Sequence, residues 1–171
     1  MKNKITIRKQ KLTSDQANFL TEEVIKVPNI SYFRPDFWLK IPIYATFVDG
    51  EFAGACGLVD LSKDFKKIGP FVILRKFQAQ GIGKRLFEEI LKDNKDKKLL
   101  IYTTNPAMMA IVRKNNFSEV STFYMLSPAV FVYIIKHILG NISLTLMKCS
   151  LRKRRFKAVN GKTFILRPIT K

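Results

Sequence analysis

Residues 68 to 92 hold an apolar run, a turn with two glycines and an amphipathic run in direct succession. The apolar run Ile68 to Leu74 predicts a strand, with an irregular or edge beginning at Gly69-Pro70. After the turn, apolar residues recur at helical spacing: Ile82, Leu86, Phe87, Ile90 and Leu91. These residues therefore predict a strand, a tight turn and a helix in succession, as found in α/β folds.

The remaining pattern predicts more elements of the same kind. The expected strands are 4–9, 43–48, 52–61, 99–104 and 117–126, and the expected helices are 13–27 and 107–115. Thr13 and Gln16 form a capping box, and Asp49-Gly50 is a strong signal for a two-residue hairpin turn. The aromatic stretch 29–42 predicts an irregular loop or short helix that could line a pocket. The 171 residues fit one ordinary domain with its own core.

The amino-acid composition indicates the kind of binding partner and the cellular compartment of the protein. Hydrophobic residues make up 47% of the chain and charged residues 26%, which excludes a wholly disordered protein. The net charge of +18 favours anionic partners. Two cysteines, Cys56 and Cys149, and one histidine give neither a disulfide framework nor the spacing of a metal site. We therefore expect a cytoplasmic protein without a metal, and we read the alternating N-terminus as a strand rather than a signal peptide.

The segment Gln78-Ala-Gln-Gly-Ile-Gly-Lys84 is the strongest candidate for a binding site. Backbone N–H groups and the positive end of a helix meet where such a turn opens a helix, and together they favour an anion. A plain helix-starting turn is the structural alternative. The segment is not a P-loop, because Arg85 follows Lys84 where Ser or Thr is needed, and Leu86 replaces the third glycine of a dinucleotide motif.

The segment fits the signature Q/R-x-x-G-x-G/A, and here the chain resembles the GNAT superfamily of N-acetyltransferases. A second similar feature is Thr104-Asn105-Pro106-Ala107 before a helix that ends at Asn116-Phe117, where relatives commonly have Gly-Phe. The resemblance implies a GNAT fold, a mixed central sheet flanked by helices, with the acyltransferase core in residues 1–126. It also implies an enzyme that binds a CoA thioester, acetyl-CoA, as donor and an amine, of a kind the sequence does not specify, as acceptor.

The resemblance assigns roles residue by residue. Backbone groups of Val72, Ile73 and Leu74 would pair with the pantetheine arm, and Asn105 would touch it. The pyrophosphate site would consist of Gln78, Gln80, Gly81, Ile82, Gly83 and Lys84. An N–H near Ile73 or Leu74 could face the thioester oxygen while the amine attacks directly, without an acyl-enzyme.

The chain departs from the family at its proton-transfer residues. Val112 stands where relatives often have a tyrosine acid, and Ile68 to Leu74 lacks the usual glutamate. Asp60 is the candidate substitute base, and Tyr124 or Tyr102 the candidate acid, although a strand-end carboxylate and core aromatics are the plainer interpretations. The alternative function is a CoA-binding module with weak or no turnover and a basic tail on membrane or RNA.

Residues 127–171 form an expected extension that packs on the same domain. Ser127 and Pro128 open an apolar helix over 129–149, and a basic hairpin turned by Asn160-Gly161 follows. Packing on the sheet is the favoured interpretation, and a homodimer through 129–149 is a variant of it. Arg152, Lys153, Arg154 and Arg155 could instead contact an acidic membrane surface, making the protein membrane-peripheral, or RNA.

Overall fold

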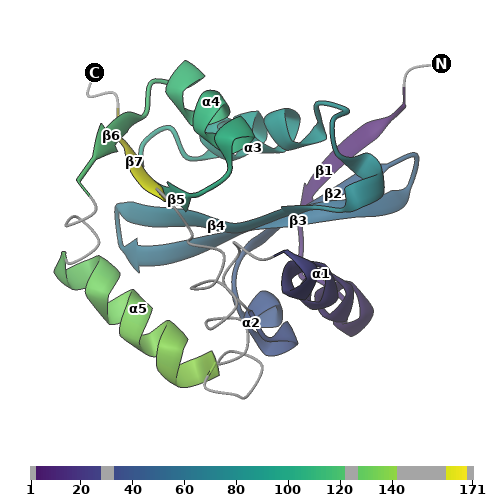
Figure 1. The fold of residues 1–171 in the computed structure, drawn as a ribbon, viewed down its shortest axis with the longest axis horizontal. Coiled ribbons are helices and arrows are strands. Elements are labelled where there is room, and N and C mark those ends of the chain that lie inside the picture. Colours follow the sequence, from purple (N-terminus) through teal and green to yellow (C-terminus); the bar gives the residue numbers. More distant parts are fainter. Residues whose placement is uncertain (1–2, 28–32, 122–126, 142–160, 169–171) are drawn as a thin grey trace. The chain divides into compact units, whose positions relative to one another are not determined.

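A computed structural model of the chain describes residues 3–27, 33–121, 127–141 and 161–168 (Figure 1). The seven strands of its mixed sheet follow the order β1-β2-β3-β4-β5-β7-β6. The chain forms two compact units: residues 1–26, 33–59 and 68–95 make the first, and residues 27–32, 60–67 and 96–171 the second. The third and fourth strands of the chain run through both units.

The first unit contains the predicted strand-turn-helix unit and the hairpin before it. Its elements are β1 (Ile5–Lys9), α1 (Ser14–Lys26), α2 (Pro35–Lys40), β2 (Ile43–Val48), most of β3 (Glu51–Ser62) and β4 (Phe65–Ile73), a 3-10 turn (Arg75–Phe77) and α3 (Ile82–Asp93). β1 and β2 pair antiparallel, as do β2 and β3. In Figure 1, α1 and α2 lie on one side of these strands and α3 on the other.

Local chemistry explains where these elements begin and turn. The predicted capping box is present, since Thr13 N–H donates to Gln16 Oε1 at 3.1 Å and Gln16 N–H donates to Thr13 Oγ1 at 3.2 Å. Asp49 and Gly50 both have positive φ, at 49° and 86°, as a type I′ hairpin turn requires. The expectation for β4 was wrong at its beginning: the strand starts at Phe65, and Gly69-Pro70 lies inside it.

The predicted aromatic stretch contributes to the core of the first unit. Trp38 on α2 is completely buried and Phe33 nearly so, with their ring centroids 6.0 Å apart. Phe33 also packs against Phe37 at 4.9 Å. A buried Thr21 on α1 fixes this segment by donating to the carbonyl of Phe33 at 3.1 Å. Phe33 and Trp38 therefore hold α2 against the core, and neither offers an exposed ring to a ligand.

The second unit is a three-stranded antiparallel group with one helix on each face. Its elements are β5 (Lys98–Thr103), α4 (Pro106–Lys114), β6 (Ser118–Val120), α5 (Pro128–Asn141) and β7 (Lys162–Leu166). β7 pairs with both β5 and β6. Successive side chains of a strand point to opposite faces: Phe164 lies under the guanidinium of Arg113 on α4, and Ile165 packs in a cluster with Val130 on α5.

Several predictions lie outside the described residues. These are Tyr124, the end of the strand expected over 117–126, the end of the helix expected over 129–149, the basic run 152–155, and the first strand of the C-terminal hairpin. The second strand of that hairpin is β7, which joins the sheet. The division of the chain at residue 126 stays a prediction. No helix among the described residues is long and apolar enough to span a bilayer.

Candidate acetyl-CoA site

The glycine segment lies where β4 passes into α3, in the first unit. β4 ends at Ile73, the 3-10 turn follows, and Gly81 is the N-cap of α3 with φ at +75°. The first intrahelical bond at this end runs from Arg85 N–H to Gly81 C=O at 3.1 Å. The N–H groups of Ile82, Gly83 and Lys84 therefore have no acceptor within the helix. They point out of its positive end, as an anion site requires.

The two glycines of the segment differ in their surroundings, and only Gly81 faces open space. A Cβ on Gly81 would meet no atom within 4 Å, so the space beside it is free of protein, and residues 78–81 are exposed. A Cβ on Gly83 would lie 3.6 Å from Ile73 Cγ1 and from Phe71 Cε1. These are ordinary van der Waals distances, so the first turn of α3 lies against the end of β4 without requiring glycine at position 83. The cradle has room for a phosphate group and backbone donors directed at it.

Two glutamine side chains tie the loop to the strand and turn before it. Gln78 Nε2 donates to the carbonyl of Ile73 at 2.8 Å, and Gln80 Nε2 donates to the carbonyl of Lys76 at 3.0 Å. These bonds give both side chains a positioning role that the signature alone did not indicate. A contact of either glutamine with the cofactor stays a prediction.

Backbone groups at the end of β4 differ in their availability. Leu74 N–H donates to Ala53 C=O of β3 at 2.9 Å, so this N–H is already used. Because the backbone groups of successive strand residues point to opposite edges, those of Ile73 point away from β3. Gly54 makes the pairing possible, since a Cβ there would lie 2.3 Å from Val72 O. Of the two N–H groups considered for the thioester oxygen, that of Leu74 is therefore occupied by its bond to Ala53, and a role of the Ile73 N–H stays a prediction.

The surroundings of the loop are basic. Arg75, Lys76, Lys84 and Arg85 are all exposed on the turn and the first helical turn. Lys76 pairs with Glu51, and Lys84 Nζ lies 3.7 Å from Glu88 Oε1. Exposed pairs of this kind are weak and leave the side chains mobile. Four cations around uncapped N–H groups favour a polyanionic ligand.

Asn105 lies in the second unit, where it caps α4. Its Oδ1 accepts from Ala107 N–H at 2.9 Å and from Met108 N–H at 3.4 Å, while Pro106 occupies the first helical position. This local role is sufficient to explain Asn105 and Pro106 in this order. A contact of Asn105 with the cofactor stays a prediction.

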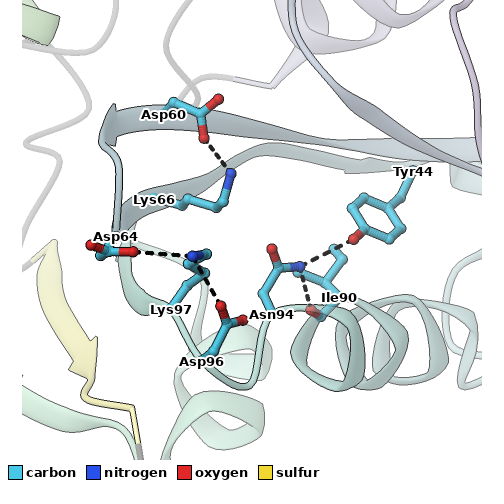
Figure 2. Close-up of polar contacts among 8 residues, drawn as sticks. All are labelled: Tyr44, Asp60, Asp64, Lys66, Ile90, Asn94, Asp96 and Lys97. Carbon is cyan, nitrogen blue, oxygen red and sulfur yellow. Dashed lines mark hydrogen bonds and ion pairs between the residues drawn. The ribbon is translucent and has the colours of Figure 1, made fainter.

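The candidate catalytic residues have structural roles where they are described. Asp60, at the end of β3, forms an ion pair with Lys66 across the hairpin (Figure 2). Beside it, Lys97 pairs with Asp64 and with Asp96 at 3.1 and 2.9 Å.

Tyr102 is partly exposed and packs its hydroxyl close to Gly161. Cys56 is buried and donates to Gly57 C=O at 3.3 Å. Among the described residues, no three His, Cys, Asp or Glu side chains are grouped to hold a metal.

The model of the acetyltransferase (GNAT) family matches residues 13–117, well over half of the chain. The chain therefore belongs to the GNAT family of acetyltransferases. This confirms the resemblance noted in the sequence, the mixed α/β fold and the enzyme class, an N-acetyltransferase that uses acetyl-CoA. No curated protein matches the chain.

Solved structures share the fold at low sequence identity. The ribosomal-protein-S18-alanine N-acetyltransferase from Escherichia coli is 15% identical with a TM-score of 0.59, over 69% of this chain and 80% of that one. Rv2747 from Mycobacterium tuberculosis, in complex with CoA and NLQ, is 12% identical with a TM-score of 0.64, over 96% and 99%. N-acetylglutamate synthase from Neisseria gonorrhoeae, complexed with coenzyme A and N-acetyl-glutamate, is 15% identical with a TM-score of 0.62, over 99% and 36%.

Proposed function

We propose that this chain transfers an acetyl group from acetyl-CoA to a primary amine by direct attack in a ternary complex. The open first turn of α3 is the observation that carries the proposal. Its uncapped N–H groups and the free space beside Gly81 fit the pyrophosphate of CoA. Of the three solved proteins of this fold described above, one is an N-acetyltransferase and two were solved with coenzyme A, which supports the same ligand.

The end of β4 supplies the second part of the site. With the pyrophosphate on α3, the pantetheine arm would run along the edge of β4 formed by Val72, Ile73 and Leu74. The amine nitrogen attacks the thioester carbonyl, a C–N bond forms, and the C–S bond breaks to release CoA thiolate. The Ile73 N–H would donate to the carbonyl oxygen as negative charge develops there. The proton lost by the amine goes to solvent or to the departing thiolate.

Proton transfer is the part of the reaction for which the described residues offer least. Val112, where a tyrosine acid is usual, is completely buried in α4. Asp60 pairs with Lys66, which favours its role as a surface ion pair over that of a base. A positioned acid or base typically contributes about 10²- to 10⁴-fold in rate. We therefore expect slow turnover unless the amine arrives unprotonated or Tyr124 supplies the acid.

The glycines of the chain offer a matched pair for testing cofactor binding. Gly81 and Gly50 both have positive φ, and a Cβ on either meets no atom within 4 Å. Replacing either by alanine imposes a similar backbone cost, on the order of 1 to 2 kcal/mol. Only Gly81 lies at the helix end proposed to bind the pyrophosphate. We expect acetyl-CoA to raise the melting temperature of wild type and of Gly50→Ala, and to do so much less for Gly81→Ala.

Thiol release measured against a panel of primary amines then tests turnover. Release that requires both the amine and acetyl-CoA, and that falls in Gly81→Ala but not in Gly50→Ala, supports the proposal. An equal loss of the thermal shift in both variants would contradict the assignment of the pyrophosphate to α3. A thermal shift without thiol release from any amine would instead favour cofactor binding without turnover.

A further inference from the structure

One face of helix α5, in the second unit, packs against the hydrophobic core. Val130 is completely buried and packs with Phe65, Leu100 and Ile165. Ala129 and Ile134 are partly buried against the same cluster. These contacts fix the rotation of the helix, and so they determine which of its side chains face outward.

The outward face of α5 is also apolar. Phe131, Val132, Ile135 and Leu139 are exposed by 48, 50, 40 and 65%, respectively. At about 100° per residue these four positions fall within an arc of roughly 100° on the helix. They are four of the seven large hydrophobic side chains exposed among the described residues. Scattered exposed side chains need no explanation, whereas a gathered set on one face indicates an interaction surface.

Charge identifies the kind of partner. Residues 127–171 contain ten Lys and Arg and no Asp or Glu, so this part of the sequence contributes +10 to the total of +18. Lys136 is exposed one helical turn after Val132, at the border of the apolar face. Lys67 Nζ lies 5.0 Å from the ring centroid of Tyr133 on the same helix. An apolar helix face in a strongly basic, acid-free part of a protein suits a surface that is apolar inside and anionic outside.

Two other partners fit these observations less well. A second copy would bring another chain with a net charge of +18 against this one, which like-charge repulsion disfavours. Single-stranded RNA is held by aromatic stacking and cations. Phe131 is the only aromatic residue among the four.

We propose that the face formed by Phe131, Val132, Ile135 and Leu139 docks on the surface of an anionic membrane, with α5 lying in the plane of the headgroups. The apolar side chains enter the region below the headgroups, and the neighbouring lysines contact lipid phosphates. The inference does not depend on acetyl transfer, because its readout is binding to vesicles.

The experiment uses the full chain and sedimentation with vesicles of phosphatidylcholine, with or without 30% phosphatidylglycerol. We expect binding to the acidic vesicles that weakens with added salt, and little binding to phosphatidylcholine alone. The variant Phe131→Gln/Ile135→Gln/Leu139→Gln keeps every positive charge and uses a good helix former. It should reduce binding to acidic vesicles by about tenfold or more. Phe19→Gln on α1 is the matched control, since Phe19 is 44% exposed, and should bind like wild type.

Circular dichroism and thermal melting show whether the variants are folded. If the triple variant unfolds, Leu139→Gln alone serves, because Leu139 is the most exposed of the four, and we expect about a threefold loss. Unchanged binding of a folded variant would overturn the proposal, since charge alone would then hold the membrane. The proposal would also be overturned if vesicle binding were absent and the same substitutions abolished self-association or RNA binding.

Discussion

The side-chain amide of Gln78 donates a hydrogen bond of 2.8 Å to the carbonyl oxygen of Ile73, the last residue of β4. The bond spans the 3-10 turn and joins the start of the glycine segment to the end of the strand. It ties the loop to the end of β4, the part of the strand proposed to bind the pantetheine arm. Gln78, the first residue of the signature, therefore stabilises the conformation of the loop before any cofactor binds.

Replacing Gln78 by leucine should loosen this loop with little effect on the fold. A single exposed hydrogen bond contributes about 1 kcal/mol, and its loss should appear mainly as an increase of about fivefold in the Kd or KM for acetyl-CoA. Titration calorimetry measures the affinity, and steady-state kinetics should show kcat much less affected. Gln80→Leu, which removes the bond to Lys76 within the turn, is the comparison and should have the smaller effect. Unchanged affinity in Gln78→Leu would mean that the bond to Ile73 is given up when the cofactor binds.

Gly54 sets how closely β3 can approach the end of β4. An added Cβ would lie 2.3 Å from Val72 O and 2.9 Å from Ile73 Cα, so the backbone itself would have to move. Overpacking of this kind costs about 1 to 3 kcal/mol, and φ at +151° adds strain. We expect Gly54→Ala to lower the free energy of unfolding by about 2 kcal/mol or more in urea titrations. Gly50→Ala, at an open turn, should cost less, since it carries only the backbone cost on the order of 1 to 2 kcal/mol, and equal losses in the two variants would contradict the steric argument.

The sequence predicted what depends on local chemistry. The capping box at Thr13, the turn at Asp49-Gly50 and the helix start at Gly81 need only neighbouring residues, and the structure has all three. The beginning of β4 was missed because the charged residues Lys66 and Lys67 interrupt its apolar pattern, whereas pairing with neighbouring strands decides its length. The insertion of β7 between β5 and β6 depends on contacts far apart in the chain, which periodicity does not report.

For the candidate site, too, the sequence predicted the features that depend on single residues and missed those that depend on distant contacts. The positive φ of Gly81 at the start of α3 could be predicted, because it is a property of a single glycine, whereas binding of an anion there stays a prediction. The positioning role of Gln78 could not be predicted from the sequence, because its hydrogen-bond partner Ile73 depends on the conformation of the 3-10 turn between them. The aromatic residues Phe33 and Trp38 suggested a pocket lining, but they pack in the core, because composition does not distinguish a buried ring from an exposed one.

Asn94 ends α3 and joins it to β2 through a buried polar contact (Figure 2). Its Nδ2 donates to Tyr44 Oη at 3.1 Å and to Ile90 C=O at 2.8 Å. The side chains of Asn94 and Tyr44 are both buried. Tyr44→Phe removes this acceptor together with the contacts of the hydroxyl with Lys9 and Asp93, and should lower the free energy of unfolding by about 1 to 1.5 kcal/mol. Tyr102→Phe is the control, because that ring is partly exposed and the change should stay within about 0.5 kcal/mol. Equal effects in the two variants would show that the contact with Asn94 does not stabilise the fold.

The ion pair between Lys9 on β1 and Asp93 at the end of α3 predicts a weak dependence of stability on pH. Their charged atoms lie 2.9 Å apart. The hydrogen bond to Lys9 lowers the pKa of Asp93 below its usual value, and the bond to Asp93 raises the pKa of Lys9. A lowered carboxyl pKa contributes stability that is present above the unfolded value of about 3.9 and is lost as the pH falls through the folded value. The Lys9 side chain is exposed and that of Asp93 is partly exposed, so solvent screens the pair and we expect less than about 1 kcal/mol.

A double-mutant cycle with Lys9→Gln and Asp93→Asn, followed by urea unfolding at pH 7 and at pH 3, isolates this pair. The coupling between the two sites should be a few tenths of a kcal/mol at pH 7 and should decrease as the pH is lowered, because protonation removes the charge of Asp93. Added salt at pH 7 should reduce it as well. A coupling that is the same at both pH values would show that Lys9 and Asp93 interact through packing around Tyr44, whose ring centroid lies 5.3 Å from Lys9 Nζ, rather than through their charges.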